Sequence, residues 1–236
     1  MGRIWAVSSG NGGTGKSTIA LALAAGAAKN GQNAILLDAS GISRSCDLVL
    51  GLESIVVLDV LDVLREQAGI ESALYPVPHY DHLRFACASL YDHNIAASEF
   101  ASVVLALNSL CDVLVIDLPT GACGLGQSIL RIEDELICVI RPDDASIRAA
   151  ERLLAQLPTS CRCNLVVNRM SKEKIRRSIH YPHESIQSML DCPVIACIPE
   201  DSSIPIGEKQ GRSAIECDGP AWNALDNLVH TLLCGI

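Results

Sequence analysis

The chain has 236 residues, of which 49% are hydrophobic, 19% charged and only 3% aromatic. This composition excludes intrinsic disorder and predicts an aliphatic core, typical of a sheet that helices cover on both faces. With 18 Lys and Arg against 27 Asp and Glu, the net charge of −9 disfavours non-specific binding to nucleic acid. The sequence shows neither a bilayer-spanning apolar run nor a secretory or lipidation signal, so we expect a cytoplasmic protein.

Eleven cysteines occur, an odd number without a zinc-ribbon spacing. Most stand inside apolar runs, so we expect reduced thiols that pack as small hydrophobic side chains and do not bind a metal.

Buried strands alternate with helices along the whole chain. We predict strands at 3–8, 33–38, 83–88, 113–117, 136–140, 165–168 and 193–198, and helices at 17–29, 99–110, 145–157 and 221–233. Such alternation requires right-handed crossovers, which give a three-layer, doubly wound, mostly parallel α/β sheet with helices on both faces. The length fits a single nucleotide-binding domain over residues 1–236. Ligands of such sheets bind beyond the carboxyl ends of the strands.

A glycine-rich loop follows the first predicted strand and leads into the first predicted helix. Its glycines allow backbone amides to turn towards phosphate oxygens, and the helix N-terminus adds partial positive charge. The Lys can reach the β- and γ-phosphates, and the following Ser can ligate Mg²⁺. The predicted nucleotide-binding residues of the loop are Gly10, Asn11, Gly12, Gly13, Thr14, Gly15, Lys16, Ser17 and Thr18.

The same loop also fits a dinucleotide-binding fingerprint through Gly10, Gly12 and Gly15, with Asp38 about twenty residues further on. That alternative is an NAD-binding Rossmann oxidoreductase. It gives no role to the Lys-Ser pair or to a second strand-terminal acid, so the phosphate loop is the favoured interpretation.

Two acids end predicted strands that face the same crevice. Asp117 ends the apolar run VLVID, which is the Walker-B arrangement, and Asp38 ends NAILLD. We therefore predict a Mg²⁺ site at Ser17, Asp38 and Asp117, and catalytic roles for Lys16, Asp38 and Asp117. Asp38 could alternatively serve as a helix or loop cap.

Five segments in order resemble the MinD/ParA family of P-loop ATPases, the MinD branch in particular. They are SGNGGTGKST, LLDASGISRSCDLVLGL, VLVIDLPTG, RPDDASIRAAER and the pair VVNR with IPED. The resemblance implies ATP and Mg²⁺ as cofactors, and it places Asn168, Arg169, Pro199, Glu200 and Asp201 near the adenine. It further implies an ATP-driven homodimer, a protein partner that stimulates hydrolysis, and a task in positioning the division site, chromosomes or organelles.

The sequence departs from the family pattern at four positions. Asn11 stands where the family has its signature lysine, and Ser40 replaces an acid of the first switch. Ser45 and Ala149 replace a further Asn and acid. Since a charge delivered across a dimer is worth about 10³–10⁵ in rate in related chemistry, we predict a weak or atypical ATPase whose homodimer Asn11 weakens. A non-hydrolysing ParA-like localisation scaffold is the alternative.

Two segments of the sequence are candidates for binding a membrane or DNA. The last predicted helix lacks Lys and Arg, so we expect it to pack on the core and do not expect a membrane anchor. The basic run KEKIRR at 172–177 has the character of a solvated helix face, so we do not expect DNA binding. The sequence does not identify the regulatory protein partner.

Overall fold

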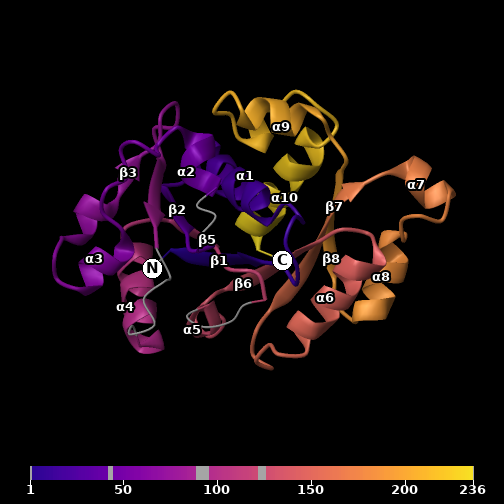
Figure 1. Ribbon diagram of the computed structural model, residues 1–236, viewed down its shortest axis with the longest axis horizontal. Helices are drawn as coiled ribbons and strands as arrows, with labels where there is room; N and C mark the ends of the chain where they lie inside the picture. The colour runs from indigo at the N-terminus through magenta and orange to yellow at the C-terminus, as the bar shows by residue number, and fades with distance from the viewer. Residues whose placement is uncertain (1, 42–44, 89–95, 122–125, 236) are drawn as a thin grey trace.

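The computed structural model describes residues 2–41, 45–88, 96–121 and 126–235 (Figure 1). Within these ranges the strands are β1 (Arg3–Ser8), β2 (Ala34–Asp38), β3 (Tyr75–Pro76), β4 (Leu83–Cys87), β5 (Val113–Asp117), β6 (Glu135–Ile140), β7 (Cys163–Met170) and β8 (Val194–Pro199). They form one sheet in the order β3-β4-β2-β5-β1-β6-β7-β8. Only β3 runs antiparallel to its neighbour among these strands. The predicted doubly wound, mostly parallel sheet is confirmed.

Helices cover both faces of this sheet. In chain order they are α1 (Lys16–Lys29), α2 (Ser45–Leu50), α3 (Val60–Leu64), α4 (Ala97–Asn108), α5 (Gly126–Ile129), α6 (Asp144–Leu154), α7 (Lys172–Arg176), α8 (His183–Leu190), α9 (Ser203–Glu208) and α10 (Trp222–Cys234), with 3₁₀ turns η1 (Ile70–Ala73) and η2 (Ala214–Glu216). Figure 1 shows α1, α2, α9 and α10 on one side of the sheet and α4, α6 and α8 on the other.

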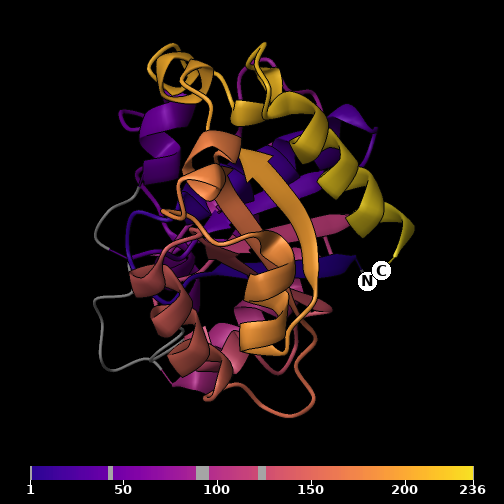
Figure 2. The same ribbon diagram turned by 90° about the vertical axis from the view of Figure 1, so that its right-hand side faces the viewer.

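Alternation along the strands divides the core into two apolar layers. In β5, Val113 and Val115 pack with α1 and α10, whereas Leu114 and Ile116 pack with α4 on the opposite face. Strands of this kind are buried on both faces, which explains their runs of Val, Ile and Leu without polar breaks. Figure 2 shows β8 at the edge of the sheet, with α8 on one face and α10 on the other.

The first and last long helices pack against each other. Eleven residues of α1 are buried, which accounts for a sequence that is apolar all round. On α10, the buried side chains are Leu225, Leu228, Val229 and Leu232, so its apolar face belongs to the core as expected. Among the described residues, no helix combines the length and the apolar character required to cross a membrane.

Candidate functional site

The glycine-rich loop joins β1 to α1 at the carboxyl edge of the sheet. Gly13 and Gly15 have φ angles of +74° and +90°, a region that side-chain-bearing residues rarely adopt. Gly15 is the N-cap of α1, and since it has no side chain it leaves the first-turn amides uncapped. A Cβ on Gly12 or Gly13 would meet no atom within 4 Å. The loop therefore presents open backbone and a helix N-terminus, which suits an anion.

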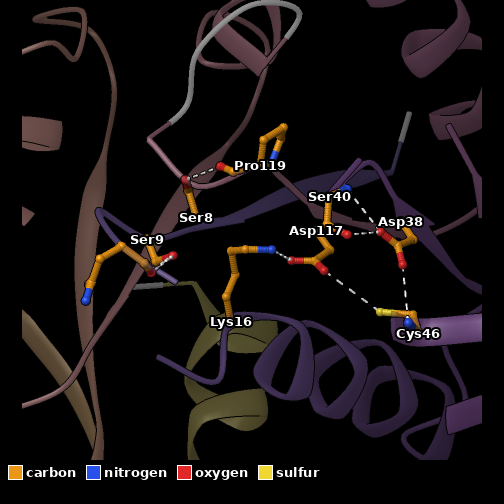
Figure 3. A network of polar contacts seen from close by, with 9 residues as sticks. Ser8, Ser9, Lys16, Asp38, Ser40, Cys46, Asp117 and Pro119 are labelled. Atoms are coloured by element: carbon orange, nitrogen blue, oxygen red, sulfur yellow. Dashed lines mark hydrogen bonds and ion pairs between the residues drawn. The ribbon is translucent and has the colours of Figure 1, made fainter. Parts of the chain in front are cut away.

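Lys16 points from the start of α1 to the end of β5. Its ammonium forms a buried ion pair with the Asp117 carboxylate (Figure 3). Burial raises the pKa of Asp117 to about 6 although Lys16 lowers it, and the nearby Asp38 charge raises it further. A hydrogen bond from Ser17 also stabilises the ionised form. The structure therefore brings together the lysine, the serine and the strand-terminal acid that the sequence predicts.

Asp38 lies directly opposite Asp117, because the two residues are register partners on β2 and β5. Its Oδ1 accepts hydrogen bonds from the Ser40 amide at 3.0 Å and the Ser40 hydroxyl at 2.6 Å. Its Oδ2 accepts from the Cys46 amide at 3.2 Å, at the start of α2. Asp38 thus holds Ser40 and the start of α2, in line with its alternative role as a cap, and it also faces the second acid (Figure 3).

Cys46 is a site residue that the sequence analysis did not single out. Its thiol donates to Asp117 Oδ2 at 3.9 Å, and burial with the two neighbouring carboxylates raises its pKa well above the usual value. Within the described residues, one ligand atom each from Asp38, Cys46 and Asp117 lie within 4.8 Å of one another. Magnesium prefers oxygen donors. The two carboxylates and the Ser17 hydroxyl therefore fit Mg²⁺, whereas the protonated thiol does not.

Asn11 is anchored to its own chain. Its Oδ1 accepts a hydrogen bond from the buried Ser146 hydroxyl at 3.2 Å, and its carbonyl accepts from Ser9 Oγ at 2.9 Å. The Ser146 hydroxyl also accepts from the Arg141 amide at 2.9 Å. Gly10 packs on the same helix, since a Cβ there would lie 2.2 Å from the backbone of Ala149 in α6. The front of the loop is therefore held against α6.

Two adjoining cavities, which share part of their walls, form a hollow beside the loop. The first, of about 380 Å³, is lined by loop residues from Gly12 to Thr18 together with Ser9, Ser40 and Thr120. The second, of about 430 Å³, is lined by Asn168, Arg169, Pro199, Glu200, Asp201, Ser202, Ile204, Pro205 and Glu208. Gly15, Thr18 and Arg169 line both.

All five residues predicted beside the adenine line the second cavity. The predicted residues Gly10, Asn11, Asp38 and Asp117 lie outside the walls of both, the two acids being buried behind Lys16. The α9 residues at the far wall were not predicted. Their only sequence signal is that they directly follow the last strand, where a parallel sheet gathers its ligand-binding loops.

Asn168 joins the wall of the second cavity to the glycine-rich loop. Its side-chain amide donates to the Thr14 carbonyl at 2.8 Å, and a Cβ on Gly15 would lie 2.2 Å from that amide nitrogen. Only a glycine at this position allows the end of β7 to approach the loop so closely. Across the hollow, the Thr18 hydroxyl donates to Glu208 at 2.7 Å and connects α1 to α9.

Comparison with known proteins agrees with this geometry. A ParA family model, described as NUBPL iron-transfer P-loop NTPase, matches residues 1–233. The chain belongs to the MinD/ParA family of P-loop ATPases. The septum site-determining protein MinD of Synechocystis sp. is 31% identical over 91% of this chain and 82% of its own length.

Solved MinD structures share the whole fold of this MinD/ParA protein. A chain of the MinC:MinD cell division protein complex of Aquifex aeolicus superposes with a TM-score of 0.89 and 26% identity, covering 99% of this chain and 97% of that one. Pyrococcus horikoshii MinD, solved with Mg-ADP, gives a TM-score of 0.81 and 25% identity, covering 100% and 98%. The predicted MinD/ParA-type assignment is confirmed. The comparisons lend no support to the scaffold or the NAD-dependent oxidoreductase.

Proposed function

We propose that this MinD/ParA protein binds ATP with Mg²⁺ in the hollow that these two cavities form. The glycine loop and the first turn of α1 receive the phosphates, and the cavity between Asn168 and Pro199–Asp201 receives the adenine. The observation that carries the proposal is the joining of the two cavities at Gly15, Thr18 and Arg169. This arrangement puts a base-sized space next to a loop of free amides and one buried ammonium.

Lys16 has two roles in this proposal. In the structure it neutralises Asp117, and in the complex its ammonium reaches the β- and γ-phosphates at the mouth of the loop. Asp117 and Ser17 then hold Mg²⁺, with Asp38 opposite. The metal supplies charge neutralisation of the phosphate oxygens. Because Lys16 and Asp117 are both buried, their exchange of partners occurs out of bulk water, where charge interactions are strong.

Hydrolysis is slow in this proposal because two charged groups are missing. Asn11 has no charge to offer a partner subunit's phosphates, and its Oδ1 is already bound to Ser146. Ser40 uses its hydroxyl on Asp38, so it offers neither a base nor an acid to orient a water molecule. The same absence of charge at position 11 weakens an ATP-driven homodimer.

The relatives indicate the kind of cellular task. The Synechocystis relative is named a septum site-determining protein, and the Aquifex structure contains MinD together with MinC. By analogy we propose that this protein works in spatial organisation of the cytoplasm and that an as yet unidentified regulatory protein acts on it. Neither a membrane nor DNA is part of the proposal.

Titration calorimetry with Mg²⁺ and ATP tests the binding part. Wild type and Lys172→Met, a change at an exposed lysine of α7, should bind ATP, and Lys16→Met should lose at least tenfold in affinity. Failure of the wild type to bind ATP would show that the hollow has another ligand. Equal affinity in the Lys16→Met variant would remove the phosphate role of this lysine.

Turnover tests the hydrolysis part. The double variant Asn11→Lys, Ser40→Asp should hydrolyse ATP faster than the wild type and should form more dimer on size exclusion with a non-hydrolysable ATP analogue. If the wild type already turns over as fast as the double variant, the substitutions do not limit the rate. That result would leave the binding proposal intact.

A further inference from the structure

Three cysteines gather at the amino-terminal ends of β7 and β8, across the sheet from the nucleotide hollow. Cys161 and Cys163 are half-buried at the start of β7, and Cys192 is buried just before β8. All three pack on the face that α6 and α8 cover, with Cys138 of β6 in the same apolar layer. Neither the family assignment nor the proposed nucleotide site gives these thiols a role.

Cys163 and Cys192 lie side by side. Leu165 of β7 and Val194 of β8 are register partners in this parallel pair. Cys163 stands two residues before Leu165, and Cys192 stands two residues before Val194. Neighbouring strands are about 4.8 Å apart, within the Cα separation of about 4.4–6.8 Å that a disulfide requires. The Cys192 thiol donates a hydrogen bond to the Cys163 carbonyl oxygen at 3.2 Å, and its sulfur accepts from the Cys163 thiol.

The hydrogen bond between the two thiols makes them chemically unequal. It raises the pKa of Cys163, which donates, and lowers the pKa of Cys192, which accepts. Burial and the nearby Glu133 raise the pKa of Cys161 to about 12, so this third thiol stays protonated. Of the three thiols, Cys192 is therefore the one whose pKa favours the reactive thiolate form.

We propose that Cys163 and Cys192 form a reversible dithiol–disulfide pair that small-molecule disulfides oxidise. The Cys192 thiolate attacks one sulfur of a reagent RSSR, which forms a Cys192–SR bond and releases one RS⁻. The hydrogen bond that held the proton on Cys163 is then lost. Cys163 gives up that proton, attacks the Cys192 sulfur and expels the second RS⁻. Two electrons pass from the two thiols to RSSR, and their two protons leave with two RSH.

Burial limits the reaction to a small reagent. Cys192 is only 6% exposed, and β8, which begins just after it, is the edge strand among the described strands (Figure 2). Asp191, directly before Cys192, has a φ of +46°. An aspartate in this left-handed conformation ends α8 and turns the chain sharply, which places the Cys192 sulfur beside β7.

A metal site is the competing use of these thiols. Within the described part of the chain, the one group of three ligand atoms lying within 4.8 Å of one another is Asp38, Cys46 and Asp117. The thiols at β7 and β8 therefore do not present three converging ligands, whereas a disulfide needs only two sulfurs.

Peptide mapping of the wild-type protein tests the proposal directly. The reduced protein is incubated with oxidised glutathione, alkylated under denaturing conditions and digested. We expect a peptide pair joined through Cys163 and Cys192, an intact mass lower by about 2 Da, and recovery of both thiols after dithiothreitol. Full alkylation of both cysteines after oxidation would overturn the proposal, as would a major cross-link through Cys161 or Cys138.

Variants and zinc provide the controls. Cys192→Ser should abolish the cross-link, and the remaining thiol of the pair, Cys163, should carry no stable glutathione adduct. Cys197→Ser, a change further along β8, should retain the cross-link. If both variants retain it, the assignment is wrong. Stoichiometric zinc that co-purifies and blocks oxidation would show that the thiols bind a metal instead. Since the wild-type map needs no variant, poor folding of Cys192→Ser leaves the test decisive.

Discussion

Gly10 is the position at which a single methyl group tests how the phosphate loop is built. A Cβ there would lie 2.2 Å from the carbonyl carbon and oxygen of Ala149, whereas ordinary contacts begin near 3.4 Å. Both partners are backbone, so the loop and α6 would have to separate by about 1.2 Å. Forced separations of this kind cost about 1–3 kcal/mol of unfolding free energy. We therefore expect Gly10→Ala to be destabilised by that amount.

Gly12→Ala is the matched control in the same loop. Gly12 is not among the glycines with positive φ, and a Cβ there would meet nothing within 4 Å. Its unfolding free energy should stay within about 0.5 kcal/mol of the wild type. Urea denaturation without nucleotide, followed by circular dichroism, gives both values. Equal midpoints for the two variants would refute the close approach of the loop to α6.

Three further predictions concern two residues in the walls of the hollow and the buried acid behind Lys16. Asn168→Ala leaves the Thr14 carbonyl without its 2.8 Å donor and should lower the unfolding free energy by about 1–3 kcal/mol in urea denaturation. Burial raises the pKa of Asp201, but hydrogen bonds, one of them from the Ala221 amide, outweigh it and lower that pKa. The ionised Asp201 therefore stabilises the fold above pH 3.8, and this contribution is lost on acidification below that pH. Below pH 3.8 the wild type should lose more unfolding free energy than Asp201→Asn, and parallel pH curves for the two proteins would contradict this. For Asp117 the dependence on pH is reversed, because its pKa is raised from 3.8 to about 6 and ionisation therefore destabilises the fold. As the pH rises from 3.8 to about 6, metal-free wild type should lose about 3 kcal/mol of unfolding free energy relative to Asp117→Asn. A difference between the two proteins that stays constant with pH in chemical denaturation would argue against this.

The sheet could be predicted from the sequence because its strands are long apolar runs between helices. The runs at 3–8 and 113–117 match β1 and β5 residue for residue, and the others differ by a few residues at their ends. The two-residue β3, the short helices α2, α3, α5 and α9 and the eight-residue α8 were not predicted as elements, whereas the run at 172–177 described as a helix face contains α7. Segments of four to six residues hold less than two helical turns, so tertiary contacts decide their conformation and no periodicity shows in the sequence.

Some features of the site could likewise be predicted from the sequence, and others could not. The facing of Asp38 and Asp117 follows from the sequence, because both acids end adjacent parallel strands. The place of Cys46 does not, since it depends on how the loop after β2 folds back and caps Asp38. The anchoring of Asn11 on Ser146 was equally out of reach, because it joins residues 135 positions apart through side chains.

The charge balance of the site explains why a neutral residue suits position 40. Asp38 and Asp117 face each other in a buried region where Lys16 supplies one compensating charge, and Asp38 already raises the pKa of Asp117. An acid at position 40 would add a third negative group next to Asp38, in a medium where repulsion is weakly screened. Ser40 instead donates a hydrogen bond to that carboxylate. The neutral Ser40 therefore avoids a repulsion that an acid at this position would add beside the two buried carboxylates.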